Sequence, residues 1–166
     1  MWTRAQAELR QLWEQTRDKV RAYMFCACSD WNDADDLAQE CYLRALRNWD
    51  LFDGRGSRQA WLFVIARNTH IDWLRRQTTR RKIRATEGEV GVRTTPTTYE
   101  RDEIEMLWEA VNALHRDHRE VIHLRFAAGL SYAEMAEALN VPVGTVRSRL
   151  HRGLKMLRRG VLQNGD

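Results

Sequence analysis

Hydrophobic residues recur along this chain at intervals of three and four, the spacing that gathers side chains on one face of an α-helix. Ala, Leu, Arg, Glu and Gln are plentiful, and only 2 prolines and 9 glycines interrupt them. In residues 33–48 the apolar stripe consists of Leu37, Cys41, Leu46 and either Leu43 or Ala45. The pattern predicts helices over residues 5–28, 33–48, 60–76, 103–115, 117–127, 132–139 and 143–162.

Two stretches interrupt the helical pattern. Residues 49–59 hold two glycines and are predicted to form a loop. Residues 78–101 are rich in threonine and basic residues and poor in apolar ones, a composition typical of a linker. The expected fold is therefore all-α, with two small helical domains at residues 1–77 and 102–166 joined by a flexible linker at residues 78–101.

The charges of the chain are segregated. A net charge of +4 and a pI of about 9.2 favour a polyanionic partner only weakly. Residues 30–40 contain acidic residues and no basic one, whereas residues 147–159 contain basic residues and no acidic one. Since a solvated helix face usually mixes its signs, the two blocks indicate two different partners, one basic and one acidic.

Several classes of protein fit the sequence poorly. No window approaches the eighteen or so unbroken apolar residues of a membrane span, and the N-terminus lacks a signal-peptide core, so we expect no membrane insertion and a cytoplasmic location. The three cysteines are odd in number, have no disulfide spacing, and are expected to be buried and reduced. They are Cys26, Cys28 and Cys41. No catalytic, metal-binding or phosphate-binding motif appears, so we expect neither an enzyme nor a cofactor.

Residues 130–157 carry the strongest local signal. Ser131 and Glu134 have the spacing of a capping box at the start of one helix. Asn140 suits a tight turn, and Pro142 suits the start of the next helix. That second helix has an apolar stripe of Val143, Val146, Leu150, Leu154 and Leu157.

The opposite face of this second helix is basic and rich in hydroxyl groups. Two short helices with a tight turn and such a second helix are typical of a helix-turn-helix that enters the major groove of DNA. The alternative is a solvated basic face on a structural helix. The residues expected to contact DNA are Thr145, Arg147, Ser148, Arg149, His151 and Arg152.

Residues 113–158 resemble region 4 of the sigma-70 family, with the closest match in the run PVGTVRSRL at residues 142–150. Residues 33–46 (DADDLAQECYLRAL) resemble the acidic helix of region 2, and residues 61–76 (WLFVIARNTHIDWLRR) resemble its promoter-melting helix. Only regions 2 and 4 are matched, which is the minimal plan of the extracytoplasmic-function (ECF) sigma factors. The resemblance implies a protein that binds core RNA polymerase, recognises two promoter elements and opens the DNA.

The resemblance also implies roles for particular residues. The acidic helix would bind the coiled coil of the polymerase beta-prime subunit, region 4 would contact the beta flap and the −35 element, and an anti-sigma factor would restrain both domains. The residues implied in polymerase binding are Asp33, Asp35, Asp36, Gln39 and Glu40. Those implied in contact with the −10 element are Phe52, Arg55, Ser57, Arg67, Asn68, Arg75 and Arg76.

Other interpretations remain open from the residues alone. An ordinary helix-turn-helix regulator would bind duplex DNA as a symmetric dimer, and a pure interaction protein would use only the acidic helix. The acids of that helix could also serve the helix dipole without any partner. Trp61 and Trp73 are expected in the core, whereas Phe52 is balanced between core packing and contact with a base.

Overall fold

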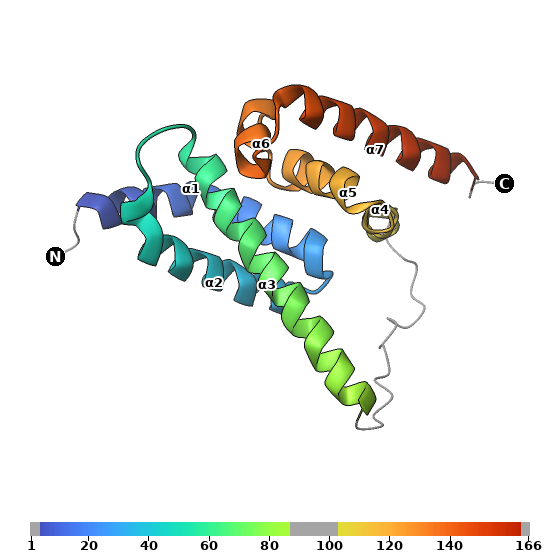
Figure 1. Cartoon of the computed structure of the whole chain (residues 1–166), viewed down its shortest axis with the longest axis horizontal. Helices are drawn as coiled ribbons and strands as arrows, with labels where there is room; N and C mark the ends of the chain where they lie inside the picture. Colours follow the sequence, from blue (N-terminus) through green and yellow to red (C-terminus); the bar gives the residue numbers. More distant parts are fainter. Residues whose placement is uncertain (1–3, 87–102, 164–166) are drawn as a thin grey trace.

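Every element that the structure describes, over residues 4–86 and 103–163, is helical, and these ranges contain no strand. This computed structural model confirms the predicted all-α class (Figure 1). The first half holds α1 (Arg4–Cys28), α2 (Trp31–Asn48), the short 3₁₀ turn η1 (Trp49–Leu51) and α3 (Arg58–Thr86). The second half holds α4 (Glu103–Asn112), α5 (Arg116–Ile122), the π-helical segment η2 (His123–Ala127), α6 (Tyr132–Leu139) and α7 (Val143–Gln163).

Helices α1, α2 and α3 pack around a shared apolar core. Asp30 is the N-cap of α2, and its carboxylate accepts a hydrogen bond from the Asp33 amide. Helix α2 therefore begins at Trp31, two residues before the predicted start at Asp33. Ala45 is fully buried and Leu43 is exposed, which settles the alternative left open by the spacing. The fully buried side chains of this half include Leu9, Val20, Met24, Leu62 and Phe63.

Helix α3 is longer than its sequence pattern predicts. The prediction that it ends at Arg76 was wrong, because the helix continues through residues 78–86, which we had assigned to the linker. Thr78 and Thr79 are accommodated because each hydroxyl donates a hydrogen bond to the backbone carbonyl four residues earlier, at 3.0 and 3.1 Å. Residues 87–101, the rest of the predicted linker, lie outside the described residues.

In the second half, the predicted capping box is present. The Ser131 hydroxyl accepts from the Glu134 amide, the Glu134 carboxylate accepts from the Ser131 amide, and α6 has the predicted bounds. Asn140 adopts a left-handed conformation with φ of 52°, as the tight turn requires. These features set the start of α7 and therefore the direction of its basic face.

The buried face of α7 differs from the prediction at one position. Val146 and Leu150 are buried, but Leu154 is 40% exposed and Gly153 is buried in its place. A Cβ at Gly153 would lie 3.0 Å from the Ile122 side chain, so the absence of a side chain allows α7 to cross close to α5.

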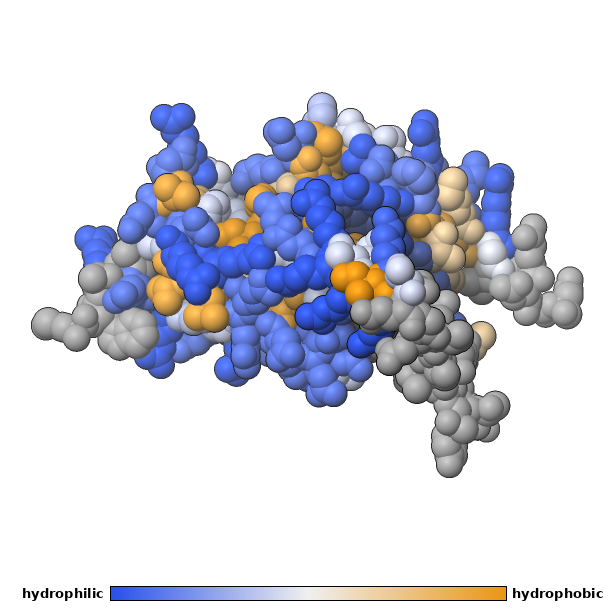
Figure 2. Space-filling model, turned by 60° about the horizontal axis from the view of Figure 1, so that its bottom comes forward, coloured by the Kyte–Doolittle hydropathy of each residue, from blue (hydrophilic) through white to orange (hydrophobic). Residues whose placement is uncertain are grey.

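The two halves of the chain are in contact, which the sequence did not predict. Helix α3 packs against α6, and α1 packs against η2. Tyr23 of α1 meets His123 of η2 edge-on, with ring centroids 6.4 Å apart, and both side chains are buried. On the face drawn in Figure 2, hydrophilic side chains predominate and hydrophobic ones reach the surface in separate patches.

Candidate nucleic-acid interface

The basic face of α7 is open to solvent. Arg147, Ser148, His151 and Arg152 are exposed, while Thr145 and Arg149 are partly buried. Arg149 forms an ion pair with Asp117 of α5 at 3.1 Å. This pair holds Arg149 against α5, whereas Arg147 and Arg152 remain exposed.

The aromatic ring of Tyr132 lies close to two arginine side chains. The Arg147 guanidinium lies 5.7 Å from the ring centroid, and the Arg125 guanidinium lies 5.3 Å from it. Tyr132 is the first residue of α6, which is the first of the two helices of the helix-turn-helix. Arg125 of η2 and Arg147 of α7 therefore lie close to the same ring.

The five predicted polymerase-binding residues of α2 differ in how free they are. Asp36 and Gln39 are exposed. Asp35 is paired with Arg21 of α1, and the hydrogen bond lowers the pKa of that carboxyl. Burial raises the pKa of Asp33, and the neighbouring carboxylates act in the same direction.

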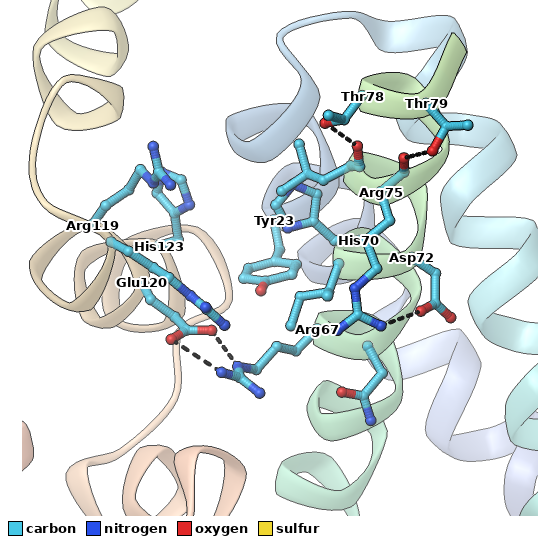
Figure 3. A pocket seen from close by; sticks show the side chains of 14 residues that line it. Tyr23, Arg67, His70, Asp72, Arg75, Thr78, Thr79, Arg119, Glu120 and His123 are labelled. Carbon is cyan, nitrogen blue, oxygen red and sulfur yellow. Dashed lines mark hydrogen bonds and ion pairs between the residues drawn. The ribbon is translucent and has the colours of Figure 1, made fainter. Parts of the chain in front are cut away.

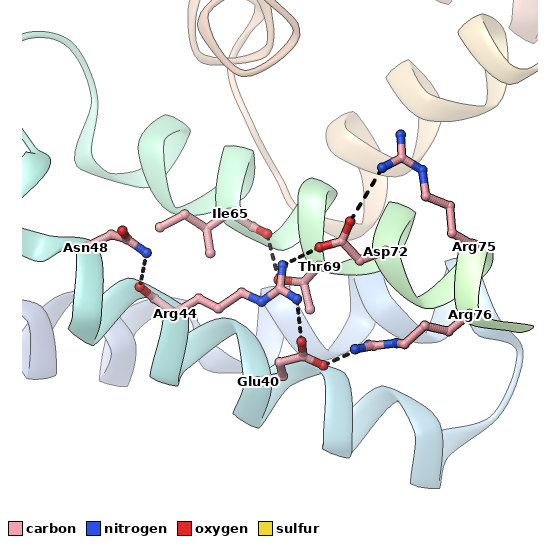
Figure 4. Close-up of polar contacts among 8 residues, drawn as sticks. All are labelled: Glu40, Arg44, Asn48, Ile65, Thr69, Asp72, Arg75 and Arg76. Atoms are coloured by element: carbon pink, nitrogen blue, oxygen red, sulfur yellow. Dashed lines mark hydrogen bonds and ion pairs between the residues drawn. The ribbon is translucent and has the colours of Figure 1, made fainter.

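Glu40, the fifth of these residues, belongs to a network between α2 and α3 (Figure 4). Its carboxylate accepts hydrogen bonds from Arg44 and, at 3.0 Å, from Arg76, and Arg44 also donates to Asp72 at 2.7 Å. Burial alone would raise the pKa of Glu40, but the hydrogen bonds from the two arginines outweigh it and the pKa is lowered. Glu40 is therefore ionised and ties the acidic helix to α3.

The loop between η1 and α3 contains a small hollow. Phe52 is half-buried, and its ring lies 5.9 Å from Trp49 and 5.7 Å from Trp61. Trp61 itself is partly buried against the core, as is Trp73. The hollow has a volume of about 190 Å³, and its lining includes Phe52, Arg55, Ser57, Trp61 and Glu137 of α6.

Along α3 the remaining candidates differ in their partners. Asn68, Arg75 and Arg76 are exposed, and the two arginines form ion pairs with Asp72 and Glu40, respectively. Arg67 reaches across to the second half, where its guanidinium donates hydrogen bonds to the carboxylate of Glu120. This ion pair is partly buried, with the two side chains 25% and 13% exposed.

A cleft of about 1000 Å³ separates α3 from α5 and η2 (Figure 3). Arg67 and Glu120 point toward each other across it, and Tyr23, His70 and His123 are among its lining residues. Burial lowers the pKa of His70 to about 4 and that of His123 to about 3, and the charge of Arg119 adds to both shifts. Both rings are therefore neutral at neutral pH.

Sequence reasoning missed the acidic side of these contacts. Glu120 and Glu137 were not expected at any site, and Glu134 was expected only as part of the capping box. Each of these glutamates contacts a residue of the first half. No local sequence pattern predicts such a contact, because an isolated glutamate on a helix is typical of solvent-exposed surface. The cysteines follow the prediction: all three are free, with Cys26 and Cys41 buried and Cys28 partly buried.

Within residues 4–86 and 103–163, no group of three or more His, Cys, Asp or Glu side chains could hold a metal ion. None of the helices in these ranges has the length and apolar character needed to span a bilayer.

The sequence matches two family descriptions. "Sigma-70 region 2" matches residues 12–80, and "Sigma-70, region 4" matches residues 104–157. Among solved structures, the sigma factor RpoE in complex with the anti-sigma factor NepR from Bartonella quintana is 28% identical, with a TM-score of 0.73 over 96% of this chain and 98% of that one. CnrH in complex with the cytosolic domain of CnrY shares the fold, with 23% identity and a TM-score of 0.67 over 97% of this chain and 91% of that one.

Curated relatives give the same family. The ECF RNA polymerase sigma factor SigX of Bacillus subtilis is 33% identical over 163 residues, covering 89% of this chain and 80% of the relative. SigW of the same organism, also an ECF RNA polymerase sigma factor, is 31% identical over 155 residues, covering 86% and 83%. With both sigma-70 regions matched in order, the chain belongs to the ECF sigma factors of the sigma-70 family.

Proposed function

We propose that this sigma factor binds core RNA polymerase through the exposed acidic face of α2. The support is the free position of Asp36 and Gln39 on a helix that is otherwise fixed to the protein. Asp35 and Glu40 already form ion pairs with arginines of this chain. They would contribute to polymerase binding once these ion pairs rearrange. Opposite charges accelerate and orient such an encounter, and the basic coiled coil of the beta-prime subunit is the expected partner.

For the −35 element, we propose that α7 enters the major groove. Its exposed Arg147, Ser148, His151 and Arg152 project from a helix whose other face is held by Val146 and Leu150. An arginine can donate two hydrogen bonds to a guanine, and hydroxyl groups can bond phosphates. Contact of this second half with the beta flap is proposed from the family alone.

For the −10 element, we propose that the loop before α3 captures an unstacked base of the separated strand. Phe52 lines the hollow in this loop, and stacking on an aromatic ring is a common way to hold a base. Arg55 lines this hollow, and Asn68 and Arg75 are exposed further along α3, where they would contact the same strand beyond the captured base. Ser57, Arg67 and Arg76 would join them only after leaving their present acidic partners.

We also propose that the chain has two domains, at residues 1–77 and 102–166, although α3 continues beyond the first boundary to Thr86. An anti-sigma factor is a proposed partner, because the solved relative RpoE is bound to the anti-sigma factor NepR. The protein would act in the cytoplasm, where polymerase and chromosome are found, without a cofactor and without catalysing a reaction itself.

The polymerase contact can be tested with one pair of variants. Asp36→Lys reverses a charge on the proposed face, and Asp18→Lys makes the same change on α1, where the Asp18 side chain is 92% exposed. Since like charges across an interface cost several kcal/mol, Asp36→Lys should weaken binding to sigma-free core polymerase about tenfold or more, while Asp18→Lys should bind like the original chain. Equal affinity of the two variants would contradict the proposal.

A further inference from the structure

The side chain of Arg147 is placed by an aromatic ring rather than by a carboxylate. Two residues further along α7, Arg149 forms an ion pair with Asp117 at 3.1 Å. Within the described part of the chain, no acidic residue forms such a pair with Arg147. Its guanidinium lies over the ring of Tyr132 instead, 5.7 Å from the ring centroid.

The ring of Tyr132 is itself held in place. Tyr132 is the first residue of α6, directly after the Ser131 cap, and it is 37% exposed. The guanidinium of Arg125 lies 5.3 Å from the same ring centroid, and its Nη1 atom donates a hydrogen bond to the Leu130 carbonyl at 2.8 Å. Leu130 is fully buried, so this carbonyl belongs to the packed core of the second half. The ring is therefore held by the start of α6 and by an arginine that is itself anchored.

An aromatic ring in this position orients a guanidinium. The face of the ring carries a partial negative charge and attracts the cation. An exposed arginine without such a contact samples many rotamers, and this freedom is lost when its fork donates two hydrogen bonds to one guanine. An arginine that already lies on a ring has less freedom to lose, so more of its contact energy is available for recognising the base.

We propose that Tyr132 is a positioning residue for the −35 contact, and that its ring holds the guanidinium of Arg147 in the orientation that reads one base pair. Tyr132 acts through Arg147 and needs no hydrogen bond of its own to DNA. The inference rests on the proposed role of α7 at the −35 element. It adds to the reading of that base pair a second residue, which lies on the other helix of the helix-turn-helix.

Four variants of the full-length chain test this role. Tyr132→Leu removes the ring and keeps an apolar side chain, whereas Tyr132→Phe keeps the ring and removes only the hydroxyl. Arg147→Ala identifies the base pair that Arg147 reads, and the double variant with Tyr132→Leu and Arg147→Ala shows whether Tyr132 acts through this arginine. The capping box stays intact in all four, because Ser131 and Glu134 are unchanged.

Each chain is assembled with core polymerase, and its affinity is measured for duplex promoter DNA and for duplexes in which one −35 base pair is replaced. The readout is the ratio of the two affinities, because an inactive fraction of the protein leaves this ratio unchanged. A cation–π contact at an exposed site corresponds to about two- to fivefold in an equilibrium constant. Tyr132→Leu should therefore reduce the ratio about two- to fivefold at the base pair that Arg147→Ala identifies.

The other variants should give a distinct pattern. Tyr132→Phe should match the original chain at every base pair, since the ring is retained. In the Arg147→Ala background, Tyr132→Leu should cause no further loss at the identified base pair. The ratios at the remaining −35 base pairs should stay the same in both Tyr132 variants.

Several results would overturn the inference. Tyr132→Leu could keep the full ratio at the identified base pair, or could lower it equally when Arg147 is absent. A loss spread evenly over all base pairs would assign Tyr132 a structural role, and a loss in Tyr132→Phe as large as in Tyr132→Leu would make the hydroxyl the DNA contact. These results leave the proposed function standing. If Arg147→Ala changes no ratio, the proposed base contact of α7 is wrong, and the inference is wrong with it.

Discussion

Two histidines, the buried His123 and the partly buried His70, make the stability of the chain depend on pH. Both line the cleft, and the Nε2 atom of each has no hydrogen-bond partner within the described part of the chain. Burial lowers the pKa of His70 to about 4 and that of His123 to about 3. In the unfolded chain a histidine has a pKa of about 6.5, so the unfolded state binds protons first as the pH falls.

The sign and size of the effect follow from this difference. Their contribution to stability is fully present above pH 6.5 and is lost progressively as the pH falls from about 6.5 toward about 4. At pH 5 each histidine should have lowered the free energy of unfolding by roughly 2 kcal/mol relative to pH 7.5, and the pair by roughly 4 kcal/mol. That loss is comparable with much of the stability of a small domain.

The assay is urea unfolding followed by tryptophan fluorescence at a series of pH values. His123→Leu removes one of the two groups, and should reduce the loss between pH 7.5 and pH 5 to roughly 2 kcal/mol. His151→Leu, at an exposed position on α7, should keep the full pH dependence of the original chain. If His123→Leu loses as much stability as the original chain, or if neither loses any, the reasoning about the buried pair is refuted.

Two further predictions concern the helix-turn-helix. Ser131→Ala removes the hydroxyl that caps α6 and should lower the free energy of unfolding by about 0.5–2 kcal/mol in the same urea assay, whereas no change would mean that the capping box contributes nothing. Arg147→Ala should weaken binding of duplex promoter DNA by about 1–3 kcal/mol and relax the preference at one base pair, as measured by mobility shift with polymerase present. A uniform loss over all sequences would assign Arg147 to a phosphate instead.

The elements that the sequence predicted best are those with local chemical signals. The bounds of α6 follow from the Ser131 capping box and the left-handed Asn140, both of which act within a few residues. The stripe of α7 was predicted at Val146 and Leu150 but failed at Leu154, because the close crossing of α5 brings Gly153 inward instead. Periodicity predicts which face of a helix is buried, whereas the helix that packs against this face determines which of its residues are buried most deeply.

Contacts between distant segments were beyond sequence reasoning. Composition placed the end of α3 too early, since threonines that look like linker residues are satisfied by the carbonyls of their own helix. The sequence indicated candidate residues but not the residues they contact in the structure. Arg67 and Ser57 are engaged by glutamates more than fifty positions away, and only the packing of the two halves brings those charges together.

We propose that this chain directs RNA polymerase to promoters by binding the enzyme with α2 and the DNA with α7 and the loop before α3. The most direct measurement adds the purified chain to sigma-free bacterial core polymerase on fragmented genomic DNA and sequences the 5′ ends of the transcripts. The account predicts a limited set of start sites that share two upstream elements and that require the chain. Transcripts unchanged by the chain, together with symmetric binding to a palindrome in the absence of polymerase, would contradict it and favour a dimeric regulator.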